Sequence, residues 1–84
     1  MSKPHEIRIL DLDAGRLMIE ETLVKKAVRK SGIKARVSMV SDNLAIARQG
    51  LMDKVPAIEL DGIVLCHSRK IRIEELILLF QGCK

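Results

Sequence analysis

The chain has 84 residues, of which 48% are hydrophobic and 31% are charged, a balance typical of folded domains and not of disordered segments. This length leaves room for one hydrophobic core, so residues 1–84 are expected to form a single domain. The net charge of +4 is compatible with an acidic partner or a nucleic acid but selects neither.

Two further sequence features bear on cellular location. The longest uncharged apolar stretch, 76–80, is far shorter than the roughly 20 residues of a membrane-spanning helix. Residues 1–6 lack the apolar segment of a secretory signal peptide. We therefore expect a cytoplasmic protein without a membrane segment.

The first half of the chain begins with an apolar run that predicts a buried β-strand over 7–12. Asp13 is suited to cap the N-terminus of the helix that follows, over 14–31. Apolar residues recur along this helix with helical spacing, and Gly32 is suited to end it in the left-handed conformation. The segment thus predicts a strand followed directly by a long amphipathic helix.

Three further elements are predicted by simple patterns. Alternation with a period of two residues indicates a strand over 35–40. Residues 41–43 have side chains that cap helices, and they precede a short helix over 44–49. An apolar stretch near the C-terminus predicts a last helix over 73–81.

A β-hairpin is predicted between the two C-terminal helices. Pro56 must start a strand rather than interrupt one, because proline has no N–H to donate to a ladder. The turn-forming pair Asp61-Gly62 separates strands over 57–60 and 63–66. The order β-α-β-α-β-β-α then predicts an α/β fold, with a right-handed crossover between two parallel strands and with helices covering both faces of the sheet.

The stretch 55–64, VPAIELDGIV, with Gly50-Leu51 before it and Glu74-Glu75-Leu76 in the last helix, resembles the thioredoxin superfamily. The resemblance covers nearly the whole chain and is closest to the small prokaryotic thioredoxin-like, or redox-active disulfide, proteins. It implies a three-layer sandwich around a four-stranded mixed sheet. It also implies a cis peptide bond before Pro56, beside the site where that family carries its activity.

The chain departs from this family where the Cys-x-x-Cys pair would stand. The matching positions are occupied by Ala14 and Leu17, which provide no thiolate. Thiol–disulfide exchange requires a thiolate at the start of this helix. Cys66 and Cys83 are too far apart in the sequence to form such a pair. We therefore predict that the protein is not a dithiol oxidoreductase, and an enzymatic role is not expected.

Strand directions bring three loops to one end of the predicted sheet: the turn after the first strand, the loop before Pro56 and the turn after Cys66. Basic residues beside a helix N-terminus could hold a carboxylate or a phosphate there, although ordinary surface charge on turns is an alternative interpretation. The residues predicted to contact a partner at this end are Asp13, Gly15, Arg16, Lys54, Val55, Pro56, Arg69 and Arg72.

Glu20 interrupts the apolar stripe of the predicted first helix, between the directions of Val24 and Ala27. The resembling family usually has an apolar residue at this position. One interpretation is a partly buried carboxylate with a raised pKa beside the vacated site. The other is a residue at the edge of the stripe that reaches solvent or pairs with Arg16, one turn earlier.

Cys66 is the only candidate for a reactive thiol. A basic turn begins two residues after it, and such a neighbourhood lowers the pKa of a cysteine. A strand covered on both faces would instead leave this residue as an inert thiol of the core.

Three functions follow as hypotheses. The first is a redox-inactive adaptor module, a monomer or weak dimer, that binds a protein or an acidic ligand through the end of the sheet near Pro56. The second is a single-thiol redox or glutathione-linked enzyme that uses Cys66. The third is weak nucleic-acid binding, which the absence of Trp and Tyr disfavours because these residues stack on bases. No catalytic residue, cofactor site or metal site is predicted.

Overall fold

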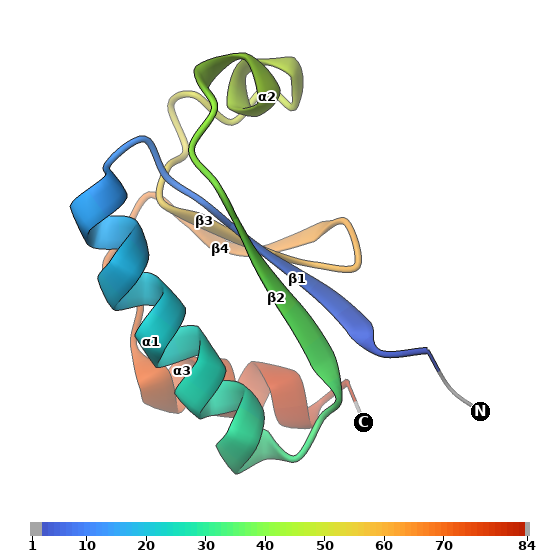
Figure 1. Cartoon of the computed structure of the whole chain (residues 1–84). Helices are drawn as coiled ribbons and strands as arrows, with labels where there is room; N and C mark the ends of the chain where they lie inside the picture. The colour runs from blue at the N-terminus through green and yellow to red at the C-terminus, as the bar shows by residue number, and fades with distance from the viewer. Residues whose placement is uncertain (1–2, 84) are drawn as a thin grey trace.

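The computed structural model describes residues 3–83. Three helices and four strands follow one another in the predicted order (Figure 1). These elements are β1 (His5–Leu10), α1 (Ala14–Ser31), β2 (Ala35–Val40), α2 (Asn43–Arg48), β3 (Ala57–Leu60), β4 (Ile63–His67) and α3 (Ile73–Gln81). None of the three helices combines the length and the apolar composition that crossing a membrane requires, within the residues described.

The four strands form one open mixed sheet in the order β2-β1-β3-β4. Strand β1 pairs with β2 in parallel and with β3 in antiparallel orientation, and β3 pairs with β4 in antiparallel orientation. The predicted four-stranded mixed sheet is therefore confirmed. Its two central strands are β1 and β3, while β2 and β4 are edge strands.

The first strand begins and ends two residues earlier than the predicted range 7–12. Asp61, in the hairpin turn, accepts a hydrogen bond from the Glu6 N–H at 2.8 Å, and its carboxylate lies 2.6 Å from His5 Nδ1. These contacts hold the start of β1 in the sheet. The apolar run signals burial, but the pairing partners decide where a strand starts and ends.

Helix α1 has both of its predicted ends. The Asp13 side chain accepts a hydrogen bond from the Arg16 N–H at 3.0 Å, and Gly32 ends the helix with φ 82°. One stripe of the helix is buried and includes Leu17 and Val24. Glu20 belongs to this same buried stripe.

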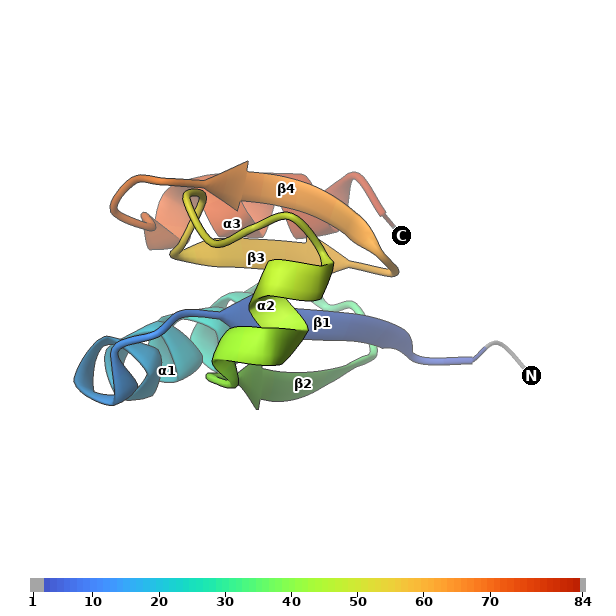
Figure 2. The same cartoon turned by 90° about the horizontal axis from the view of Figure 1, so that it is seen from above.

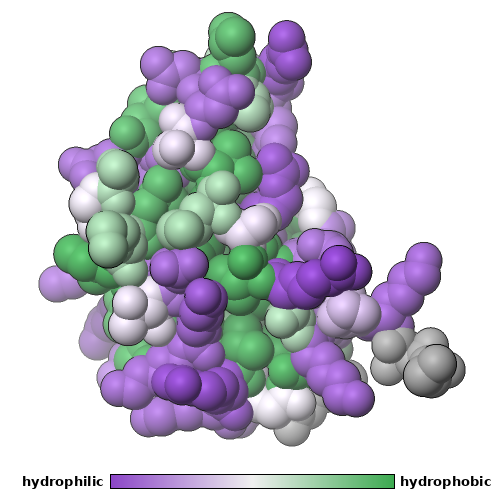
Figure 3. Space-filling view, viewed as in Figure 1, coloured by the Kyte–Doolittle hydropathy of each residue, from purple (hydrophilic) through white to green (hydrophobic). Residues whose placement is uncertain are grey.

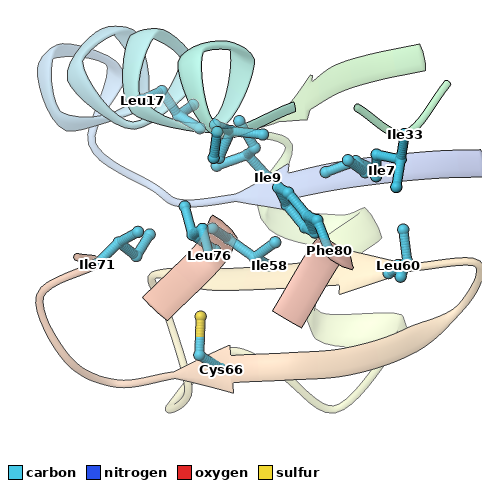
Figure 4. Packing of buried hydrophobic residues seen from close by; sticks show 12 residues of the cluster. Ile7, Ile9, Leu17, Ile33, Ile58, Leu60, Cys66, Ile71, Leu76 and Phe80 are labelled. Carbon is cyan, nitrogen blue, oxygen red and sulfur yellow. The ribbon is translucent and has the colours of Figure 1, made fainter. Parts of the chain in front are cut away.

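The main core lies between α1, α3 and one face of the sheet (Figure 4). Phe80, the only aromatic residue of the chain, is fully buried there together with Leu76 of the same helix. The remaining side chains labelled in Figure 4 are Ile7, Ile9, Leu17, Ile33, Ile58, Leu60, Cys66 and Ile71. Burial of this aliphatic surface is the main source of stability for so small a domain.

The opposite face of the sheet is covered only in part. Helix α2 lies at the end of the sheet where β1 and β2 end, beyond the strands in Figure 1 and in front of them in Figure 2. It closes a smaller core made by Leu10, Ile46, Leu51 and Ala57. Toward the other end of the sheet, Arg8 on the same face is partly exposed to solvent. Helices were expected to cover both faces of the sheet. This face is covered at one end only, because α2 has only six residues.

The hairpin between β3 and β4 has the predicted turn. Asp61 and Gly62 both have positive φ, 52° and 86°, which is the conformation that a two-residue hairpin turn requires. The Val55–Pro56 peptide bond before β3 is cis, as expected from the resemblance.

Candidate functional site

A groove of about 550 Å³ lies beside the N-terminal half of α1. Its other sides are the Val55–Pro56 loop and the segment that joins β4 to α3. The lining residues are Arg16, Ile19, Glu20, Leu23, Val55, Pro56, Ser68, Arg69, Lys70 and Ile71.

The pairing of the strands explains why these segments meet. Leu10, Ala57 and His67 are paired across β1, β3 and β4, so the chain leaves or enters all three strands at the same end of the sheet. The N–H of Ser68 then donates hydrogen bonds to the carbonyls of Lys54, at 3.2 Å, and Pro56, at 2.9 Å. These bonds fix the segment after β4 against the loop before β3.

Much of the groove wall is apolar. Ile19 and Leu23 of α1 contribute one side, and Val55, Pro56 and Ile71 contribute the others. Ile19 is 65% exposed although it is a large apolar residue. Neither the N–H nor the carbonyl of Val55 forms a hydrogen bond with another described residue. The groove therefore offers apolar contact area next to two free main-chain groups.

Arg16 does not pair with Glu20, which was one of the two possibilities for a Glu20 at the edge of the stripe. Its Nε and Nη2 donate to the two carboxylate oxygens of Asp11 at 2.8 and 2.6 Å. Asp11 is fully buried and also accepts a hydrogen bond from the N–H of Asp13. Burial raises the pKa of Asp11, but the hydrogen bonds from Arg16 and the Asp13 N–H outweigh burial and lower it. Arg16 is therefore already neutralised at the edge of the groove.

Glu20 is buried, with 7% of its surface exposed, and its Oε1 has no hydrogen-bond partner among the described residues. Burial raises its pKa to about 7, and the negative charge of Asp11 adds to this effect. Of the two interpretations of the sequence, the buried carboxylate with a raised pKa is the one that the structure supports.

The predicted contact residues divide into two groups. Those that line the groove are Arg16, Val55, Pro56 and Arg69. Those that lie outside its lining are Asp13, Gly15, Lys54 and Arg72. Arg69 forms an ion pair with Glu75 of α3, so a second cation of this region has an acidic partner.

Cys66 lies in β4 with only 6% of its surface exposed and faces the main core. Burial raises the pKa of its thiol, although the nearby Arg69 acts in the opposite direction. A reactive thiol needs accessibility and a lowered pKa, so this position does not favour the single-thiol hypothesis. Cys66 and Cys83 are both free cysteines.

The remaining basic residues of α1 lie away from the groove. Hydrophilic side chains gather over the C-terminal half of α1, whereas hydrophobic ones are more frequent near its N-terminal half (Figure 3). Lys25 in this basic segment pairs with Glu21 at 3.3 Å. This arrangement is that of a solvated helix end.

The sequence prediction omitted two groove residues of α1, Ile19 and Leu23. Helical periodicity places both at the edge of the apolar stripe. They are four residues apart and therefore share one side of the helix, with Glu20 beside them. Two apolar residues on either side of an acidic residue, at the edge of a buried helical stripe, are the sequence signal for the side of the groove that α1 forms.

No protein-family model matches this chain, and a comparison with curated proteins finds no match. The features of the groove that bear on function are its apolar walls, the unpaired main chain of Val55, two arginines paired with acidic residues and a buried carboxyl with an unpaired oxygen.

Proposed function

We propose that this chain is a redox-inactive thioredoxin-like domain that binds an extended segment of a partner protein in the groove beside Pro56. The observation that carries the proposal is the unpaired main chain of Val55 at the border of an apolar groove. An extended peptide can pair with such a segment through its own N–H and C=O groups while a side chain enters the groove.

Two observations support the redox-inactive part of the proposal: the residues at the start of α1 and the positions of the two cysteines. Helix α1 begins at Ala14, and Leu17 lies in its first turn, where the resembling family has its cysteine pair. The two cysteines of the chain lie elsewhere, Cys66 in β4 and Cys83 after α3.

A protein segment suits the groove better than a free anion. Arg16 and Arg69, the two arginines of the lining, are paired with Asp11 and Glu75. Glu20 adds a further acidic group to the wall. An anion would have to compete with these carboxylates, whereas an apolar side chain would bury surface on Ile19 and its neighbours.

The proposal is tested with linear peptides selected from a random phage-displayed library on the immobilised protein. Ile19→Glu places a charge in the groove wall, and it should weaken binding of the selected peptides about tenfold or more. Leu78→Glu is the matched control, because Leu78 is also an exposed helical residue, 70% exposed against 65% for Ile19, but lies outside the groove. This control should bind as the wild type does.

Two results would contradict the proposal. One is failure of the selection to enrich any peptide. The other is enrichment of peptides whose affinity is equal for wild type and Ile19→Glu. If Lys70→Glu abolishes binding and the selected peptides are acidic, the acidic-ligand alternative replaces the proposal of an apolar contact.

A further inference from the structure

Glu20 is a groove residue whose contacts are incomplete. Its side chain is buried in the stripe of α1 that faces the core, and it also lines the groove. Its Oε1 accepts no hydrogen bond from any described residue. A buried oxygen without a partner is costly, and such atoms are rare in folded proteins. Because Glu20 lines the groove, a ligand bound there lies next to this carboxyl group and can present a donor to it.

The neighbouring arginine cannot supply that donor without breaking another contact. The Nε and Nη2 groups of Arg16 are both used by Asp11. A hydrogen bond between the Glu20 and Asp11 carboxyl groups raises the pKa of Glu20 and lowers that of Asp11. Asp11 can only accept in this bond, so Glu20 still has no hydrogen-bond donor among the described residues.

The charges around the groove select the kind of donor. Arg16 and Arg69 are paired with Asp11 and Glu75, so Lys70 is the cation of the lining that disfavours an ammonium or guanidinium ligand. A carboxylate or phosphate would be repelled by Glu20 and could not donate to it. A neutral group that donates a hydrogen bond avoids both penalties.

We infer that Glu20 accepts a hydrogen bond from a neutral amide N–H of the ligand, whose apolar part lies against Ile19, Leu23 and Pro56. This inference rests on the proposed function and narrows it, because it names the chemistry of the residue that enters the groove. The simplest such residue is a carboxamide side chain on an otherwise apolar segment.

The inference includes a dependence on pH. An ionised carboxylate is a stronger acceptor than a protonated one, so the amide should bind more tightly as the pH rises through about 7. The charged or titratable groups around Glu20 are Asp11, Asp13, Arg16, Cys66, Arg69 and Lys70. Burial and the charge of Asp11 raise the pKa of Glu20 to about 7, so the expected pH dependence follows the titration of this carboxyl group.

Four small probes of similar shape separate the possible donors. Isobutyramide carries the neutral N–H, 3-methyl-2-butanone lacks it, isobutyrate is the anion and isobutylamine is the cation. Each is titrated into the whole ¹⁵N-labelled protein, and the amide resonances of Val55, Ser68 and Ile71 report occupancy of the groove. Isobutyramide should bind about fivefold more tightly than the ketone, the net value of one hydrogen bond.

Variants of Glu20 provide a second test of the inference. Glu20→Leu removes the acceptor and should abolish the preference for isobutyramide over the ketone. Glu20→Gln keeps the shape and an acceptor, but it should remove the rise in affinity with pH. In the wild type, saturating isobutyramide should lower the pKa of Glu20 as followed by its side-chain ¹³C resonance, and this readout needs no variant to fold.

Equal binding of isobutyramide and the ketone, tighter binding of isobutyrate or isobutylamine, or an unchanged pKa of Glu20 would each overturn the inference. The proposed function fails separately, when no selected peptide depends on Ile19. Peptides that occupy the groove without any preference for an amide would leave the proposed function standing and refute the role of Glu20.

Discussion

Glu20 on α1 and Glu59 on β3 are buried to nearly the same extent, with 7% and 6% of their surface exposed, but their surroundings differ. Glu59 lies on the partly covered face of the sheet, opposite Arg8 of the neighbouring strand. Glu20 lies on the other side of the sheet, which α1 and α3 cover, and it lines the groove.

Glu59 has dedicated partners. Its Oε1 lies 3.4 Å from Arg8 Nη1, an ion-pair contact, although this oxygen, like Glu20 Oε1, accepts no hydrogen bond from a described residue. The neighbours of Gln49 orient its amide so that the nitrogen donates to Glu59 Oε2 at 2.9 Å and the oxygen accepts from both Arg8 nitrogens, at 3.0 and 2.9 Å. This network ties the end of α2 to the sheet and places a cation beside the buried Glu59 carboxylate.

Glu20 has no cation of its own, because Arg16 is bound by Asp11. The same degree of burial therefore has different consequences on the two sides of the sheet. A carboxylate with a cation across the strand stabilises the structure, whereas one without a cation holds a proton near neutral pH and remains open to a ligand. Substitutions around the two carboxylates should therefore differ in the size and the sign of their effect on stability.

Arg8→Met should have the largest effect. It leaves the buried Glu59 carboxylate without its cation, and breaking such a pair is strongly destabilising. We expect a loss of about 2 kcal/mol in the free energy of unfolding, reduced from the fully buried case because Arg8 is partly exposed. Urea denaturation measures it. The double variant Arg8→Met/Glu59→Leu should recover most of the loss, and no recovery would show that Glu59 is not the cause.

Glu20→Gln should change stability in the opposite direction. The raised pKa keeps Glu20 protonated in the folded protein up to about 7, while in the unfolded chain it ionises from its ordinary value of 4.5. The free energy of unfolding of the wild type therefore falls as the pH rises from 4.5 to about 7. Above that range the contribution of Glu20 is fully lost.

Glu20→Gln cannot ionise at this position, so its free energy of unfolding does not show this fall with pH. At about pH 8 it should be more stable than the wild type by roughly 2 kcal/mol, and the difference should vanish below about pH 4. Thermal or urea unfolding at several pH values provides the measurement. Asp11, whose pKa is lowered, stays ionised over the range of interest and does not mask the effect. A pH-independent difference would refute the raised pKa of Glu20.

Gln49→Ala should have a smaller effect than Arg8→Met. It removes the amide that bridges Glu59 and Arg8 but leaves their ion pair in place. The loss should be about 1 kcal/mol, the typical net value of a hydrogen bond. Urea denaturation of the single and double variants with Arg8→Met tests it, because the two effects should not add if the three side chains act as one network.

Arg36→Met should have the smallest effect. Arg36 pairs with Glu6 across β1 and β2, as Arg8 pairs with Glu59 across β1 and β3, but both members of the first pair are exposed. Exposed ion pairs contribute little, so the change in unfolding free energy should stay below about 0.5 kcal/mol. A loss as large as that of Arg8→Met would mean that burial is not what distinguishes the two pairs.

Local features of the fold could be predicted from the sequence because each depends on neighbouring residues. The cap at Asp13, the left-handed end at Gly32 and the turn at Asp61-Gly62 follow from the conformational preferences of these residues, and all three are present. The position of the first strand was wrong by two residues, because its start depends on the distant side chain of Asp61.

The candidate site was only partly predictable. The sequence identified Val55, Pro56 and Arg69 as residues of one end of the sheet, since strand order brings loops together. It offered two interpretations of Glu20 and could not choose between them. The choice depends on which carboxylate binds Arg16, and Asp11 and Glu20 lie at similar distances from Arg16 along the chain, five and four residues away.

By itself, the sequence determined the order of elements, the helix ends, the hairpin and the aliphatic nature of the core, because these depend on short-range periodicity and on single-residue preferences. Only the tertiary structure decided that Asp11 binds Arg16, that Glu59 faces Arg8 and that Glu20 lines a groove without a cation. Electrostatic pairing is decided by distances of a few ångströms between side chains in space, and such distances are set by packing rather than by position along the chain.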